Sequence, residues 1–346
     1  MTWVWFQLPL ALLGLLHAAA AYSYFSKAPR AFPWTLTWVV FTVLATVLLP
    51  HWPWAVTGTF ATAIALWTFW WHSIRASARL DWVVENARQA TAQIVDDELI
   101  VRDVRNFDWQ EHQRCTPRWE DRRYQIGELA AVDLFVCTWG DPRIAHLIVS
   151  LVFDDQPPLA FSIETRREVS ESWSILAGFM KSYELIVLAA DERDVIRVRT
   201  NLRAEQVRRY RLKSSPQMRR NLLNQYLAQM NSLARKPRFY NTLFRNCTTE
   251  VVRILRASGR RLPLDWRIVV SGAVPDYLYD LGLLEDSRPL SVVTASADIG
   301  AAARAADQDP AFWRRIRQVT PPDQVLTLDA QGEPVGSPPT GGGVMV

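Results

Sequence analysis

The chain has 346 residues, 49% of them hydrophobic, and a formal net charge of +4. Its three cysteines are too few for a disulfide framework; at most Cys115 and Cys137 could pair, which would leave Cys247 free. The charge is divided unevenly, because only two side chains from residue 2 to residue 71 carry a formal charge. This division predicts a membrane-embedded front and a water-soluble body long enough for its own core.

Three apolar runs, interrupted by prolines, make up the first predicted domain, residues 1–74. The first and third runs have roughly the 20 residues that a membrane-spanning helix needs. Tryptophans near the ends of the runs are typical of an aromatic belt. We therefore expect three transmembrane helices, followed by a charged juxtamembrane linker helix. The runs cover residues 3–24, about 35–49 and about 55–73, and the linker helix covers residues 75–90.

The first run has a second interpretation, because the alanines at 18–20 resemble the cleavage site of a secretory signal. No Lys or Arg precedes the apolar region, however, as a signal would require.

The orientation of the three helices is also open. Lys27, Arg30, Arg75 and Arg79 lie on one side of such an arrangement, so the positive-inside rule alone places the body in the cytoplasm.

The body begins with β-rich runs. Residues 91–104 form two short runs around an acidic turn, which predicts a hairpin, and residues 118–126 and 132–138 are further strand candidates. A second hairpin is predicted from residues 145–153 and 159–166, in which odd positions are apolar and even positions include polar residues. All odd residues of this hairpin then share the core face.

The second hairpin brings a histidine close to a carboxylate. If Phe153 pairs with Leu159, His146 stands diagonally across from Glu164, with Ser162 one step further along. A register shifted by two residues makes His146 and Glu164 direct neighbours. Either register gives the arrangement that orients a general base. The alternative is a solvated histidine on a polar face, with Glu164 in an ordinary surface ion pair.

The later part of the body contains helices and a basic segment. Residues 173–181 and 216–236 are predicted helices, and residues 184–189 and 206–212 are predicted strands. Arginine is dense between residues 193 and 220, which indicates a solvated face or contact with anionic lipid headgroups. Nucleic-acid binding is not expected, because no recognised module is present and acidic residues are interleaved. Residues 320–346 lack periodicity and are expected to be disordered.

Cys247 lies where a polar turn gives way to a helical pattern. The apolar residues at 251, 252, 254 and 255 have the spacing of one buried helix face, so Cys247 falls in the first turn. The helix dipole and unpaired N–H groups favour a thiolate there. The alternative is a small buried hydrophobic residue at a helix start. No cofactor is expected, and His112 with Cys115 lacks the second pair that a zinc site needs.

Several separate motifs follow one another between roughly residues 101 and 319: DVRNFDW, TPRWEDRRY, DLFVCTWGDPRIAHLIVSLVF, LAFSIETRRE, ADERDVIRVRTN and FYNTLFRNCTTEV. In this order they resemble the Lnb N-terminal periplasmic domain family. The family is named for a bacterial lipoprotein N-acyltransferase and looks like a circularly permuted relative of papain-like NlpC-type peptidases and lecithin:retinol acyltransferases.

The resemblance implies an α+β fold and a catalytic site. Residues 91–319 would form a permuted papain-like domain with an antiparallel sheet and a nucleophile helix. Cys247 would be the nucleophile and His146 the base, with Glu164 or Ser162 orienting the imidazole. Backbone N–H groups at the helix start, with Asn246, would stabilise the oxyanion.

The implied protein is a multi-pass protein of the bacterial inner membrane whose catalytic domain is periplasmic. Its expected activity is acyl transfer or hydrolysis on a phospholipid or lipoprotein substrate through a Cys–His thiolate. Two alternatives remain: a peptidase or amidase acting on cell-wall peptides with the same pair, and a non-catalytic membrane scaffold. The oligomeric state is not predicted.

Overall fold

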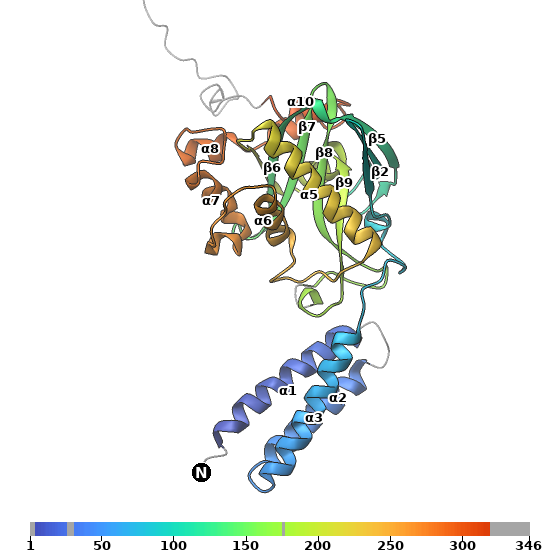
Figure 1. The fold of residues 1–346 in the computed structure, drawn as a ribbon, viewed down its shortest axis with the longest axis vertical. Coiled ribbons are helices and arrows are strands. Elements are labelled where there is room, and N and C mark those ends of the chain that lie inside the picture. The colour runs from blue at the N-terminus through green and yellow to red at the C-terminus, as the bar shows by residue number, and fades with distance from the viewer. Residues whose placement is uncertain (1–3, 26–30, 175–176, 319–346) are drawn as a thin grey trace, which may run out of the picture.

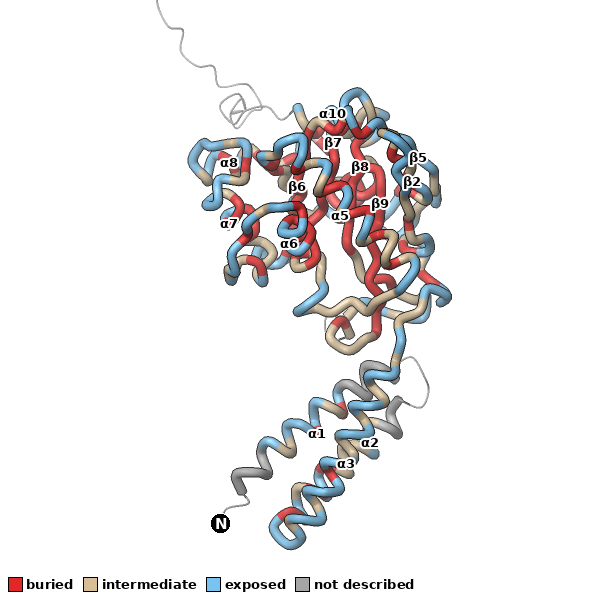
Figure 2. Tube along the Cα trace, in the orientation of Figure 1, coloured by how far each residue is buried: buried red, intermediate tan, exposed pale blue. Residues whose placement is uncertain are grey.

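The structure, a computed structural model, describes residues 4–25, 31–174 and 177–318, and the predicted disordered tail at 320–346 lies outside these ranges. Three N-terminal helices precede the body (Figure 1). They are α1 (Val4–Phe25), α2 (Ala31–Leu48) and α3 (Pro53–Ser73). The body contains a large sheet with helices on both faces, and its central strands are almost entirely buried (Figure 2).

The prediction of three transmembrane helices is wrong. The three apolar runs do form helices, but within the described residues none of these helices combines the length and the hydropathy that crossing a membrane requires. The prediction relied on the absence of charge, whereas α2 and α3 contain many threonines and tryptophans. Their hydroxyls bond back along the helix, as Thr46 Oγ1 does to Thr42 O at 2.8 Å. An uncharged run is therefore not the same as a hydrocarbon-like one.

The linker helix predicted for residues 75–90 is also wrong. This segment is irregular, with a single 3₁₀ turn at Val84–Asn86. Contacts with the body hold it in an extended path, because Val83 N donates to Arg167 O at 3.0 Å and the guanidinium of Arg166 lies 4.4 Å from the ring centre of Trp82. These tertiary contacts replace the hydrogen bonds that a helix would make within itself.

An eight-stranded sheet organises the body, in the order β1-β2-β9-β8-β7-β6-β10, with β5 paired to β2. All pairs are antiparallel except β2 and β9, which run parallel. A separate two-stranded sheet joins β3 (Asp108–Trp109) to β4 (Cys115–Thr116). The large sheet consists of β1 (Thr91–Val95), β2 (Glu98–Arg105), β5 (Trp119–Gln125), β6 (Leu129–Thr138), β7 (Ala145–Phe153), β8 (Gln156–Arg166), β9 (Glu184–Asp191) and β10 (Gln206–Arg211).

The predicted hairpins are present, and the antiparallel α+β character of the body is confirmed. The first joins β1 and β2 and the second joins β7 and β8. The turn of the second hairpin is tighter than expected, because Phe153 pairs with Gln156 rather than with Leu159. Leu159 pairs with Leu151 instead. This is the shifted one of the two registers considered from the sequence.

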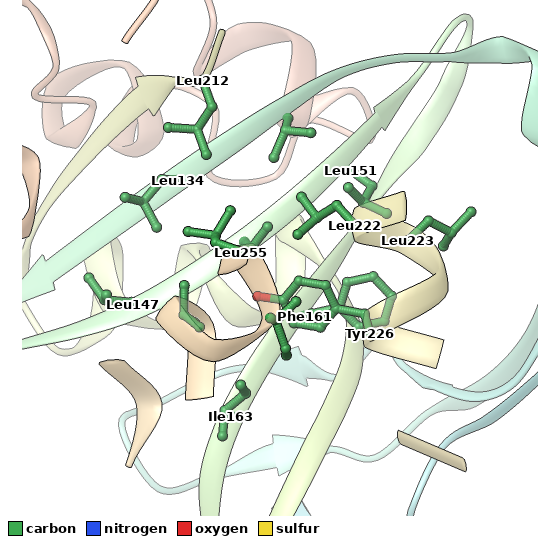
Figure 3. Packing of buried hydrophobic residues seen from close by; sticks show 14 of the residues in the cluster. Leu134, Leu147, Leu151, Phe161, Ile163, Leu212, Leu222, Leu223, Tyr226 and Leu255 are labelled. Atoms are coloured by element: carbon green, nitrogen blue, oxygen red, sulfur yellow. The ribbon is translucent and has the colours of Figure 1, made fainter. Parts of the chain in front are cut away.

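Both faces of the sheet are covered. On one face, odd residues of β7 and β8 pack against α5 (Pro216–Arg235) and α6 (Cys247–Ala257), as Figure 3 shows for Phe161 and Tyr226, whose ring centres are 4.6 Å apart. On the other face, the even residues Ile148 and Ala160 pack against a second cluster. Its members from outside the sheet lie in, or directly beside, α4 (Glu192–Val195), α9 (Gly300–Ala305) and α10 (Phe312–Arg315). Two more helices, α7 (Val274–Asp280) and α8 (Leu290–Ser296), complete the body.

Candidate active site

The nucleophile helix begins where the sequence predicted, with Cys247 as the first residue of α6. A capping box fixes this start, because Asn246 Oδ1 accepts from Thr249 N at 2.8 Å and Thr249 Oγ1 accepts from Asn246 N at 3.0 Å. The apolar residues at 251, 252, 254 and 255 form the face of α6 that packs into the core. Packing and capping together hold the thiol at the end of the helix that carries the positive dipole.

Cys247 is half-buried and lies beside Ala145, the first residue of β7. Its Sγ lies 4.0 Å from Ala145 O and 3.9 Å from Thr248 Oγ1. Burial raises the pKa of this thiol, but a hydrogen bond with His146 and the charge of the imidazole outweigh burial, so that the pKa is lowered from its ordinary value. A hydrogen bond from the Leu147 backbone acts in the same direction. The surroundings therefore favour the thiolate, which is the reactive form.

His146 is the second residue of β7, where it pairs with Cys137 on β6 and is buried. Its Nε2 lies 2.7 Å from Ser162 Oγ and 3.4 Å from Glu164 Oε1. Burial and Arg199 lower the pKa of the imidazole, but Glu164 and the hydrogen bond with Cys247 raise it to about 9. Because Nε2 is engaged by Ser162 and Glu164, Nδ1 is the ring nitrogen left for Cys247.

The two groups considered as partners of His146 act together. Ser162 Oγ donates to Glu164 Oε1 at 2.7 Å, so it bridges the carboxylate and the imidazole. The β7–β8 register pairs Ile148 with Ser162, and its continuation places His146 across from Glu164. The solvated-histidine alternative is wrong because both faces of the sheet are covered.

Two charged residues that the sequence did not single out complete the network. Arg199 lies in the π turn Val198–Leu202 and donates to Glu164 Oε1 at 3.2 Å and to Glu205 Oε2 at 3.0 Å. Burial raises the pKa of Glu164, but His146, Arg199 and Ser162 hold it well below its usual range. The carboxylate therefore stays ionised, and its Oε1 interacts with both Arg199 and His146.

The arginine-dense segment is only partly a surface feature. Arg197 and Arg199 are 3% and 6% exposed, and Arg197 pairs with Asp307 at 2.8 Å. For these two residues the prediction of a solvated or lipid-facing surface is wrong. The apolar residues Val195, Ile196 and Val198 interleaved with them were the available signal of burial.

The side chain of Asn246 has a structural role that competes with the expected one. Its Oδ1 caps α6, and its Nδ2 donates to Thr242 O at 2.7 Å. The backbone N–H groups of Cys247 and Thr248, in contrast, have no hydrogen-bond acceptor within the described residues. As the first two amides of a helix they are ready donors to an oxyanion.

Tyr240 is a further residue at the site that sequence reasoning missed. It is half-buried, packs against the same core cluster as Cys247, and burial raises the pKa of its hydroxyl, with the charges of Cys247 and Glu164 adding to this effect.

All three cysteines are free, so Cys115 and Cys137 do not pair. In the described part of the chain no group of three or more His, Cys, Asp or Glu side chains is placed to hold a metal ion.

Comparison with known proteins finds a family model that matches part of the chain. Residues 115–272, a little under half of the chain, match the family model described as the Lnb N-terminal periplasmic domain. The match spans His146, Ser162, Glu164 and Cys247 and confirms the resemblance indicated by the motifs. No curated protein and no solved structure matches the chain. The description of the family implies a protein of the bacterial envelope, and residues 115–272 are similar to the Lnb N-terminal periplasmic domain family.

Proposed function

We propose that this protein is a cysteine-dependent acyltransferase or hydrolase that acts on ester or amide bonds of a lipid-linked substrate. The observation that carries the proposal is the chain of contacts from Cys247 through His146 to Ser162 and Glu164. A half-buried thiol with a lowered pKa, next to a base held by a third group, is the usual arrangement of a nucleophilic thiol enzyme.

The reaction begins with the thiolate of Cys247 and the imidazolium of His146. The sulfur attacks the carbonyl carbon, a C–S bond forms, and the carbonyl electrons move to the oxygen. The N–H groups of Cys247 and Thr248 stabilise this oxyanion. When the tetrahedral intermediate collapses, the C–O or C–N bond breaks and His146 gives its proton to the leaving group. A thioester to Cys247 remains.

The second half of the reaction releases the acyl group. His146 takes a proton from water or from an acceptor amine, whose oxygen or nitrogen attacks the thioester carbonyl. The C–S bond breaks and the thiolate returns. Glu164 stabilises the imidazolium at both stages, and Ser162 and Arg199 position the carboxylate. Removal of one oxyanion donor typically lowers kcat by about 10²–10³-fold.

The substrate class rests on the family, which is named for a lipoprotein N-acyltransferase, and a phospholipid or a lipoprotein would supply the acyl group. Intact-mass spectrometry tests the proposal directly. After incubation with phospholipid, with diacylated lipopeptide or with cell-wall peptide, the parent protein should carry an acyl adduct from a lipid substrate on Cys247. Cys247→Ala should carry none, and Cys115→Ala should behave as the parent.

Other results would change the assignment. An adduct from the cell-wall peptide alone would establish the peptidase alternative. Equal adducts on the parent and on Cys247→Ala, or acyl transfer that survives Cys247→Ala, would refute the mechanism.

A further inference from the structure

A pocket of about 640 Å³ adjoins the candidate active site. One wall is the start of the linker after α3, and the other is the segment between α5 and α6. Tyr240 lines this pocket, and the charge of Cys247 helps to raise the pKa of its hydroxyl. Arg245, two residues before Cys247 in the chain, lines the pocket as well.

The lining of the pocket is strongly basic. Six Lys and Arg residues contribute to it, and no Asp or Glu is among the described residues that line it. Like charges gathered in one cavity repel each other unless an anion enters. The six residues are Arg75, Lys181, Arg235, Lys236, Arg238 and Arg245.

Two of these cations are held in place. Lys181 Nζ donates to Trp71 O at 2.6 Å and lies 5.6 Å from the ring centre of Phe239, and Arg238 Nη2 donates to Ser232 Oγ at 2.9 Å. Burial and the nearby charge of Arg75 lower the pKa of Lys181. The side chains of Lys181 and Arg238 therefore have fixed positions before a ligand binds.

The other four cations are exposed, and none of them forms an ion pair with a carboxylate in the described part of the chain. Three of the four are arginines, whose planar fork of donors matches the oxygens of a phosphate. The exposed ring of Phe244 and the ring of Phe239 add an apolar border to the same pocket.

We propose that this pocket binds the phosphate group of a phosphate ester and thereby places the ester carbonyl of a phospholipid acyl donor beside Cys247. The use of the pocket in acyl transfer rests on the proposed function, whereas binding of the phosphate does not. A lipid headgroup and free phosphate share this chemistry, so the test includes both.

Binding is measured with the full chain carrying Cys247→Ala, so that it does not depend on turnover. The probes are dihexanoyl phosphatidylglycerol, dihexanoylglycerol, which has the same acyl esters but no phosphate, and inorganic phosphate. Isothermal titration calorimetry should show that the phospholipid binds at least ten-fold more tightly than dihexanoylglycerol. Binding should weaken as salt is raised.

The test variant adds Arg75→Gln and Arg245→Gln, and both arginines are exposed rather than packed in the core. It should lose at least ten-fold in affinity for the phospholipid. A second variant, Arg235→Gln with Lys236→Gln, should show a loss in the same direction. The matched control is Arg123→Gln, an exposed arginine outside the pocket that pairs with Glu98, and it should bind as the parent does.

The outcomes are distinct. Competition between inorganic phosphate and the phospholipid supports one shared phosphate site, and binding of inorganic phosphate without the phospholipid rejects the lipid as the source. Equal affinity for the two lipids, or affinity unchanged in both charge variants, overturns the proposal. If phosphate-dependent binding holds but the parent forms no acyl adduct, the pocket stands and the acyl-transfer function fails.

Discussion

Ser162 Oγ lies 2.7 Å from His146 Nε2 and donates to Glu164 Oε1 at 2.7 Å. One hydroxyl therefore connects the base to its carboxylate, which lies 3.4 Å from the same nitrogen. Ser162→Ala leaves that longer contact in place but removes the bridge. We predict a fall in kcat of roughly 10-fold with little change in KM, because positioning rather than substrate contact is lost. Steady-state kinetics checks this, and an unchanged kcat would exclude a positioning role.

Glu164→Gln removes the charge that raises the pKa of His146. The folded-state pKa of the imidazole, about 9, should fall, so the fraction of imidazolium should decline at lower pH than in the parent. Activity that requires imidazolium is lost as pH rises through this pKa, and the basic limb of the kcat profile should therefore move to lower pH. At neutral pH we expect a loss of about 10–100-fold. A basic limb at the same pH in both proteins contradicts this role.

Asn246 separates a capping role from an oxyanion role. Asn246→Ala should destabilise the protein by about 1 kcal/mol because the cap of α6 is lost. Asn246→Ser keeps an oxygen that accepts from Thr249 N but has no amide donor. If the oxyanion is held by backbone N–H groups, this variant retains most of its kcat. A loss of about 10²-fold or more would instead assign an oxyanion contact to the side-chain amide.

Tyr226 carries a buried hydroxyl with no hydrogen-bond partner in the described structure. Tyr226→Phe keeps the ring stacked on Phe161 and removes an unsatisfied polar group. We predict a gain of roughly 1 kcal/mol in the free energy of unfolding, measured by chemical denaturation. Tyr183→Phe is the matched control, because the Tyr183 hydroxyl donates to Ser172 O and accepts from Ser174 N. That variant should be destabilised, and a loss of stability in Tyr226→Phe would contradict the argument.

Local patterns predicted the parts of the molecule that depend on local physics. The alternation of residues 145–153 and 159–166 correctly predicted two paired strands, and the polar-to-apolar change at Asn246 correctly placed the start of α6. The register remained open because the turn at Asp154–Asp155 is tighter than the loop assumed, so that the strand resumes at Gln156.

The remaining features depend on contacts between distant segments. The even face of β7 and β8 is buried by residues such as Ile299 and Phe312, about 150 positions away, which no periodicity within the hairpin reveals. Arg199 and Glu205 meet Glu164 only after folding. The N-terminal runs were misjudged because a lack of charge was taken for sufficient hydropathy.

The ionisation of Cys247 tests the central claim most directly. The rate of its alkylation by iodoacetamide is followed against pH by peptide mass spectrometry in the parent and in His146→Ala. His146 lowers the pKa of the thiol against the effect of burial, so the parent should show an inflection below the ordinary value of 9.0. Without His146 the inflection should move above that value, since burial then dominates. The same inflection at or above 9.0 in both proteins would contradict the account.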